Sequence, residues 1–159
     1  MKIKKQAKTK GFTIIEVVLV LAIAGLIFMM VFIALPALQR SQRDTARKSE
    51  VSTVLAQITS YQSNNRGNSP SANDAFAKYL DGSYNPTDKK ITLGSGTTVS
   101  NMAYVASTNI TAATTDNIVF IMGAKCSDTD NGQVVEGTAR QAAALVKLEN
   151  GDAYYCQTN

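Results

Sequence analysis

The sequence contains no histidine. This absence excludes His-based general acid–base catalysis, nucleophiles that depend on a neighbouring imidazole, and zinc sites with histidine ligands. There is also no glycine loop of the kind that cradles phosphates, and no clear catalytic constellation. We therefore expect no enzymatic activity, no cofactor and no metal site, although chemistry with paired carboxylates stays open.

Cysteine is almost as scarce, because the chain has only Cys126 and Cys156. Two thiols are too few for a four-thiolate zinc site. Beyond a membrane anchor, a single disulfide is the natural interpretation, whereas a cytosolic location favours free thiols. A bond between these two residues would close a loop of about 30 residues, with a nominal stabilisation of ~3–4 kcal/mol.

Positive charge is concentrated at the N-terminus. The net charge is +4, but five of the sixteen basic residues lie within residues 1–11. The rest of the chain has eleven basic and twelve acidic residues. The high isoelectric point therefore belongs to the leader, and we expect no nucleic-acid partner.

An apolar run at residues 17–35 is long enough to cross a bilayer. It holds nineteen residues without a charge, and a helix of that length spans roughly 28 Å. The lysines before it favour an N-inside orientation. A cleaved secretory signal would need a shorter apolar core. A plain anchor explains the length but leaves Gly11 and Glu16 without a role.

A lone carboxylate, Glu16, lies at the start of this run. A charge within lipid is costly unless it is neutralised, close to the interface or paired. Cleavage between Gly11 and Phe12 would create an α-ammonium at nearly the same depth. A neighbouring helix, shifted along its axis, could present that terminus to Glu16 in an apolar bundle where screening is weak.

The run KGFTIIEVV, at residues 10–18, resembles the processing site of type IV pilins and other class III prepilin-like proteins. The resemblance implies that a prepilin peptidase cuts after Gly11 and methylates the new terminus on Phe12. It also implies that Thr13 and Glu16 serve assembly. The implied partners are copies of the same chain, the lipid bilayer, an inner-membrane assembly platform and a motor ATPase.

One helix is expected from residue 12 to about residue 63. Gly25 and Pro36 are weak points where the helix would kink, either statically or by loosening during assembly. Many pilins carry this proline about three residues earlier, where Ile33 stands here. The second half of the helix has an apolar stripe for packing against a domain. It consists of Val51, Val54, Leu55 and Ile58.

A basic cluster at residues 40–48 lies between the apolar half and this stripe. We interpret it first as a solvated collar of charge. Contact with phospholipid headgroups and ion pairs between subunits are the alternatives that stay open.

The rest of the sequence, after the long helix, predicts a small sheet. The expected fold class is therefore α+β, and the resemblance to type IV pilins implies the pilin fold. Residues 67–101 are expected to form a loop-rich connector with a short helix that Ser71 caps. In residues 102–159 we expect three or four antiparallel strands, drawn from the segments 101–107, 117–123, 143–149 and 152–157. Asn150-Gly151 predicts a hairpin between the last two.

Two weaker motifs complete the sequence. Residues 127–133, SDTDNGQ, fail the spacing of an EF-hand, so a polar turn is favoured over calcium binding. Residues 109–111 match a glycosylation sequon.

The expected organisation has five parts: a cleaved leader (1–11), a transmembrane and polymerisation helix (12–38), its amphipathic continuation (39–66), the connector (67–101) and the sheet region (102–159). The expected function is a structural filament subunit that supports adhesion or twitching motility. It would lie in the cytoplasmic membrane before assembly and in an extracellular pilus afterwards. A minor pilin, a secretion pseudopilin and a membrane-tethered surface-binding module are the alternatives.

Overall fold

The computed structural model describes residues 11–104, 112–130, 132–151 and 153–159. The chain divides into two compact units, Met1–Gln39 and Arg40–Asn159, and the helix α1 (Ile14–Asn64) continues from the first into the second. The lysine-rich leader at residues 1–10 and the sequon at residues 109–111 lie outside the described residues.

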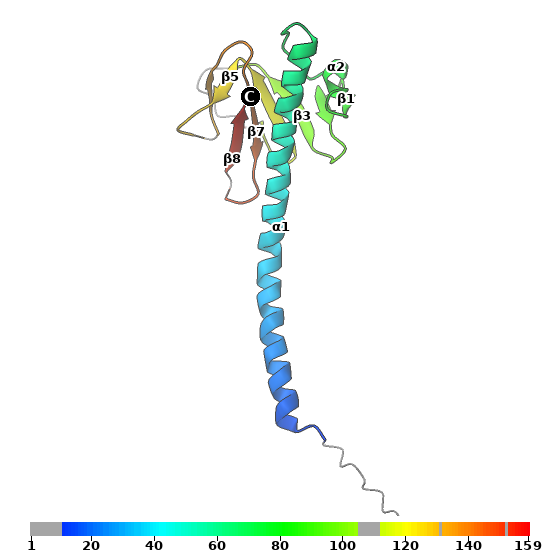
Figure 1. The fold of residues 1–159 in the computed structure, drawn as a ribbon, viewed down its shortest axis with the longest axis vertical. Helices are drawn as coiled ribbons and strands as arrows, with labels where there is room; N and C mark the ends of the chain where they lie inside the picture. The colour runs from blue at the N-terminus through cyan, green and yellow to red at the C-terminus, as the bar shows by residue number, and fades with distance from the viewer. Residues whose placement is uncertain (1–10, 105–111, 131, 152) are drawn as a thin grey trace, which may run out of the picture. The chain divides into compact units, whose positions relative to one another are not determined.

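Within the described residues, two helices and eight strands follow one another in sequence order (Figure 1). They are α1 (Ile14–Asn64), α2 (Asp74–Ala77), β1 (Ser83–Asn85), β2 (Lys90–Thr92), β3 (Thr98–Met102), β4 (Asn117–Met122), β5 (Ala124–Cys126), β6 (Val134–Glu136), β7 (Ala142–Lys147) and β8 (Tyr154–Thr158). This is the α+β arrangement expected for a pilin fold.

In the first unit, α1 is apolar on every side. Its large apolar side chains are exposed, from 44% for Val31 to 85% for Ile14. The helix is long and apolar enough to cross a membrane. It runs without interruption through Gly25 and Pro36, so loosening at these positions stays a prediction.

In the second unit, α1 lays its stripe on a six-stranded sheet of order β1-β2-β3-β4-β7-β8 (Figure 1). Val51, Val54 and Ile58 are fully buried and Leu55 nearly so, which confirms the predicted stripe. They form one core with apolar residues of α2 and of the facing sheet surface. Spacings of three and four residues place them on one side of the helix.

The opposite face of the sheet is also covered. Alternate residues of β4 and β7, such as Val119 and Leu145, pack with Ala124 of β5 and Val134 of β6. The β5–β6 hairpin therefore forms a second layer over the centre of the sheet. Burial on both faces explains why β4 and β7 are continuous apolar runs rather than alternating ones.

The sheet differs from the expectation in three respects. Three or four antiparallel strands were expected, but the main sheet has six strands and β3 pairs with β4 in parallel. A parallel pair cannot be joined by a tight hairpin turn. The connector at residues 67–101 contains β1, β2 and most of β3, so it is less irregular than predicted.

The short helix and the last hairpin were largely predictable. Helix α2 is present, but Asn73 caps it instead of Ser71, because the Asn73 Oδ1 atom accepts a hydrogen bond from the Phe76 N–H at 2.9 Å. Strands β7 and β8 form the predicted antiparallel hairpin. Gly151 in its turn has φ +78°, a conformation that glycine adopts at little cost.

Candidate functional site: the N-terminal segment and the polar clip

The start of α1 is a capping box built from Thr13 and Glu16. The Glu16 carboxylate accepts hydrogen bonds from the Thr13 backbone N–H at 2.9 Å and from the Thr13 hydroxyl at 2.8 Å. The Thr13 hydroxyl in turn lies 3.4 Å from the Glu16 N–H. Each side chain thus satisfies a backbone donor that the first helical turn leaves open.

This pairing corrects the expectation that an anchor leaves Glu16 without a role. Within its own chain, Glu16 helps to begin the helix. The sequence signal was present, because T-x-x-E before an apolar run is the signature of a capping box. Both hydrogen bonds go to the Oε2 atom of Glu16. Among the described residues, its Oε1 atom therefore has no hydrogen-bond donor.

Gly11 and Phe12 precede the cap and are exposed. Phe12 is 90% exposed, which is unusual for a phenylalanine in water. A Cβ atom added to Gly11 would have no neighbour within 4 Å, and its φ lies outside the left-handed region. The fold of the described residues therefore gives no reason for glycine at this position.

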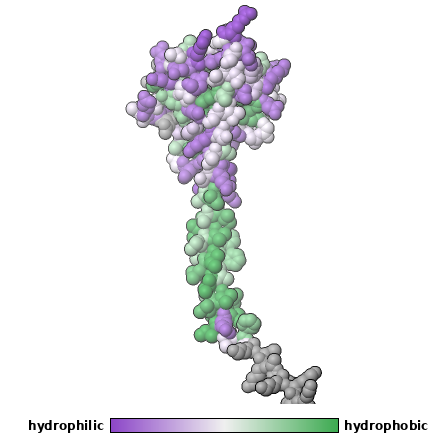
Figure 2. Space-filling model, in the orientation of Figure 1, coloured by the Kyte–Doolittle hydropathy of each residue, from purple (hydrophilic) through white to green (hydrophobic). Residues whose placement is uncertain are grey.

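The residues expected to serve processing and assembly lie together at the start of α1: Gly11, Phe12, Thr13 and Glu16. They are next to the apolar surface of the N-terminal half of this helix. Figure 2 shows this surface as green side chains covering the visible face of the N-terminal half of α1. A shallow hollow of about 230 Å³ opens between Phe12, Glu16, Val17, Val20 and Leu21. The apolar part of the Glu16 side chain therefore helps to line an apolar depression.

A second cluster, which we call the polar clip, joins α1 to the β7–β8 hairpin. It consists of Arg43, Asp44, Arg47 and Glu149. Asp44 is buried, with 6% of its surface exposed, and accepts hydrogen bonds from the N–H groups of Glu149 and Asn150. The carboxylate therefore holds the hairpin turn against the helix.

The two arginines of the polar clip surround Glu149. Arg43 binds this carboxylate with two nitrogens, and Arg47 adds a bond of 2.7 Å from Nη2. Hydrogen bonds from Arg43 and then Arg47 lower the pKa of Glu149 to about 2. Arg47 also bonds Asp44 and the Thr115 carbonyl oxygen.

The polar clip corrects the interpretation of residues 40–48 as a solvated collar. Two of the four basic residues there form ion pairs within the second unit. A third, Lys48, lies 5.4 Å from the centre of the Tyr155 ring. Asp44 and Arg47 are only three residues apart, but Glu149 is about a hundred residues away in sequence, so no local pattern could have indicated its pairing with the two arginines.

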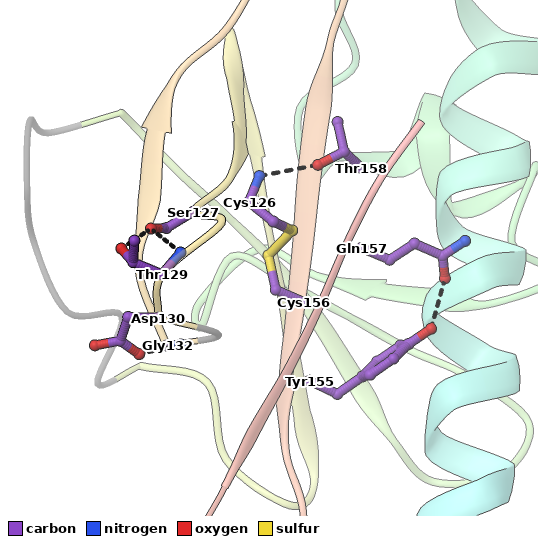
Figure 3. The surroundings of a disulfide bond; sticks show 9 residues. All are labelled: Cys126, Ser127, Thr129, Asp130, Gly132, Tyr155, Cys156, Gln157 and Thr158. Carbon is purple, nitrogen blue, oxygen red and sulfur yellow. Dashed lines mark hydrogen bonds between the residues drawn. A yellow bond between two sulfur atoms is a disulfide. The ribbon is translucent and has the colours of Figure 1, made fainter.

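The two cysteines are joined (Figure 3). The Cys126–Cys156 disulfide links the end of β5 to β8, with the two Cα atoms 5.8 Å apart. The Cys126 N–H also donates to the Thr158 hydroxyl at 2.9 Å. Together these contacts fasten the second layer to the edge strand of the main sheet. Nearby, the Asp130 carboxylate accepts from the Gly132 N–H at 2.8 Å, as in a polar turn.

These features define a class of protein. The fold combines an apolar helix long enough to cross a membrane with a small disulfide-bonded sheet unit, and the helix begins in an exposed Gly-Phe-Thr segment closed by Glu16. A helix of this kind fits anchoring in a membrane before assembly.

Residues 6–32 match the family model of the prokaryotic N-terminal methylation motif, the class III signal peptide typical of type IV pilins. The motif supports a prepilin-type protein, either pilin-like or pseudopilin-like, and implies processing by a prepilin peptidase and pilus-type assembly. No curated protein and no solved structure matches the chain.

Proposed function

We propose that this chain is a structural subunit of a type IV pilus filament. The observation that carries the proposal is the apolar half of α1, which is exposed on all sides and begins in the capped methylation segment. Such a surface is stable only in lipid or against similar helices. Each subunit would leave the bilayer by exchanging lipid contacts for contacts with sister helices.

Processing takes place at Gly11 and Phe12 in this proposal. Because the glycine has no role in the described fold, we assign its role to recognition by the peptidase. The peptidase cuts after Gly11 and methylates the amine of Phe12, which keeps its positive charge. The exposed position of Phe12 makes this bond accessible.

Glu16 then acts twice. Its Oε2 atom caps the helix through Thr13. Its Oε1 atom is left for the α-ammonium of an adjoining subunit, and the hollow beside it can receive an apolar side chain. An ion pair of this kind gains strength where water is excluded. It would set the axial register between neighbouring helices.

The role in adhesion or twitching motility, and the extracellular location, belong to this proposal as well. A minor pilin or a secretion pseudopilin would use the same anchor and the same processing. The abundance of the protein in filaments sheared from the cell surface distinguishes a major subunit from these two alternatives, since only a major subunit dominates such filaments. A surface-binding module that stays tethered to the membrane would keep its helix in lipid and form no filament.

N-terminal sequencing of the protein from sheared filaments tests the proposal. We expect the polypeptide to begin with N-methylated Phe12, followed by Thr13. A filament protein that still begins at Met1 would contradict both the processing site and the pairing of Glu16. Unprocessed protein confined to the membrane fraction would contradict the role as a filament subunit.

A further inference from the structure

A cleft of about 420 Å³ opens beside the end of α1, within the second unit. Its lining is Thr59, Gln62, Ser63, Arg66, Gly67 and Arg140. No aspartate or glutamate belongs to this lining, so its formal charge comes from the two arginines alone. Among the described residues, neither guanidinium has an ion pair or a hydrogen bond. The cleft therefore carries uncompensated positive charge, unlike the polar clip, in which each arginine pairs with a carboxylate.

Arg66 occupies a position at the helix end that favours glycine. The Gly67 N–H donates to the Gln62 carbonyl oxygen at 2.7 Å, the hydrogen bond that closes a Schellman-type helix terminus. Arg66, the residue before Gly67, has φ +57°, which lies in the left-handed region. Glycine is the usual residue at this position, because a Cβ atom makes the conformation costly. The helix end therefore does not explain an arginine at residue 66.

Contacts within the fold hold Arg140 at the same cleft. The buried Gln62 side chain donates from Nε2 to the Arg140 carbonyl oxygen at 3.0 Å, which fixes the backbone just before β7. The Arg140 guanidinium lies against Gly67, where an added Cβ atom would be 3.0 Å from Nη2 and 3.3 Å from Nε. Glycine at residue 67 therefore leaves room for this guanidinium. The second positive charge is thus placed against the residue that directly follows Arg66.

The donors available in the cleft are mainly those of the two arginines. The Ser63 hydroxyl already donates to the Thr59 carbonyl oxygen at 2.9 Å, and the Thr59 hydroxyl donates to the Leu55 carbonyl oxygen at 3.1 Å. An anion would therefore bind the guanidinium groups, each a planar fork of N–H donors. A carboxylate carries a single charge and is satisfied by one such fork. A phosphate monoester carries a charge of about −2 and three acceptor oxygens, so it matches two guanidinium groups.

We propose that the cleft between Arg66 and Arg140 binds a dianionic phosphate group, either inorganic phosphate or the phosphate of a small monoester. The two guanidinium groups donate to its oxygens. The lone pairs of the Ser63 hydroxyl can accept from a hydroxyl group of the ester. The volume of the cleft is within the range of small-molecule sites, roughly 300–1,000 Å³. The site lies entirely in the second unit and does not depend on the proposed filament.

Isothermal titration calorimetry of the full-length chain in detergent, at about pH 8 and constant ionic strength, tests the site. Inorganic phosphate and glucose 6-phosphate are the probes, and glucose is the neutral control. We expect both phosphates to bind and glucose not to bind. Arg140→Gln should weaken the binding of phosphate about tenfold or more, since charge-assisted hydrogen bonds are lost. Tighter binding of glucose 6-phosphate would assign the site to an ester, whereas equal or tighter binding of inorganic phosphate would assign it to the free ion.

Arg66→Gly separates binding from folding. Glycine suits the left-handed conformation, so the unfolding midpoint should be equal or higher while the affinity for phosphate falls about tenfold or more. Arg40→Gln, at an exposed arginine outside the cleft, is the matched control and should bind like wild type. Wild-type affinity in both cleft variants, or an equal loss in the control, would overturn the inference. Absence of phosphate binding would also overturn it, as would equal or tighter binding of dimethyl phosphate, a diester with a single charge.

Discussion

Asp44 and Glu149 are joined by a hydrogen bond from the Glu149 backbone N–H to Asp44 Oδ1, at 2.9 Å, across 105 residues of sequence. Asp44 also accepts from the Asn150 N–H and from Arg47. One buried carboxylate therefore satisfies two turn amides and a guanidinium. Asp44 thus holds the backbone of the β7–β8 turn to α1, while Arg43 and Arg47 hold its Glu149 side chain.

Replacing Asp44 with alanine should destabilise the second unit strongly. The change leaves the Nη1 group of Arg47 and two backbone N–H groups without their acceptor, and removing one partner of a buried pair costs about 3–5 kcal/mol. Urea unfolding of the full-length chain in detergent measures the loss. Asp128→Ala, at an exposed acid, is the control. A loss within about 0.5 kcal/mol, typical of surface substitutions, would show that Asp44 does not hold the turn.

Because of Glu149, the stability of the second unit should change with pH in the acid range. Its pKa is about 2 in the folded chain, below the ordinary 4.5, because Arg43 and Arg47 hydrogen-bond the charged form. A lowered pKa stabilises the fold above pH 4.5, and this contribution disappears as the pH falls toward 2. The stability difference between wild type and Glu149→Gln should therefore be constant near neutrality and shrink over that interval.

Chemical denaturation at several pH values, run on both proteins in parallel, measures that difference. The comparison cancels the titration of the other carboxylates, which both proteins share. A difference that grows on acidification, or that stays constant down to pH 2, would contradict the ion pairs of Glu149.

The disulfide should contribute substantially to stability. It closes a loop with a sequence separation of 30, for which the chain-entropy model gives about 3–4 kcal/mol. The double variant Cys126→Ser/Cys156→Ser should lose that amount in equilibrium unfolding. Dithiothreitol should lower the stability of wild type to a similar value and leave the double variant unchanged. Equal stability of oxidised and reduced wild type would refute the contribution.

Gly11→Leu should accumulate as uncut precursor. A side chain at this position meets nothing within 4 Å in the structure, so folding and insertion should be normal and the defect should lie in peptidase recognition. Immunoblotting against a synthetic mature standard distinguishes the two lengths. Gly25→Ala also adds a Cβ into open space and should be cut like wild type. Efficient cleavage of the leucine variant would disprove the assigned site.

The parts of the fold that depend on local periodicity were predictable from the sequence. The stripe of α1 follows a helical period, β4 and β7 are apolar runs, and Asn-Gly indicates the last hairpin. The methylation motif was also predictable, because its residues are contiguous. The capping box was missed although its signal is local, since Thr13 and Glu16 were interpreted only in terms of assembly.

The remaining features arise from contacts that are distant in sequence. Strands β1 and β2 have three residues each, too few for a period to appear; β2 is held by pairing with β3, and β1 by pairing with β2. Strands β3 and β4 pair in parallel, with Thr98 opposite Asn117, so no tight turn signal in the sequence indicates their register. The polar clip joins residues about a hundred positions apart. No local pattern distinguishes such arginines from solvated ones.

Substitution of Glu16 can separate its two proposed roles. Glutamine can still accept the hydrogen bonds of a capping box, whereas alanine cannot. If capping is the whole role, Glu16→Gln should assemble like wild type and only Glu16→Ala should be impaired. If the carboxylate also pairs with the α-ammonium of an adjoining subunit, both variants should be inserted and cleaved normally, and both should fail to assemble.

We expect the second result, because the Oε1 atom of Glu16 has no donor among the described residues and Glu16 itself helps to line an apolar hollow. The yield of sheared filaments from the two variants, with processing checked in the same cells, distinguishes the cases. Thr13→Ala removes the capping hydroxyl and keeps the charge, so it should reduce assembly less than either change at Glu16. Normal filaments from Glu16→Gln would show that Glu16 acts only within its own helix. The proposed assembly would then lose the ion pair that sets the axial register between neighbouring helices.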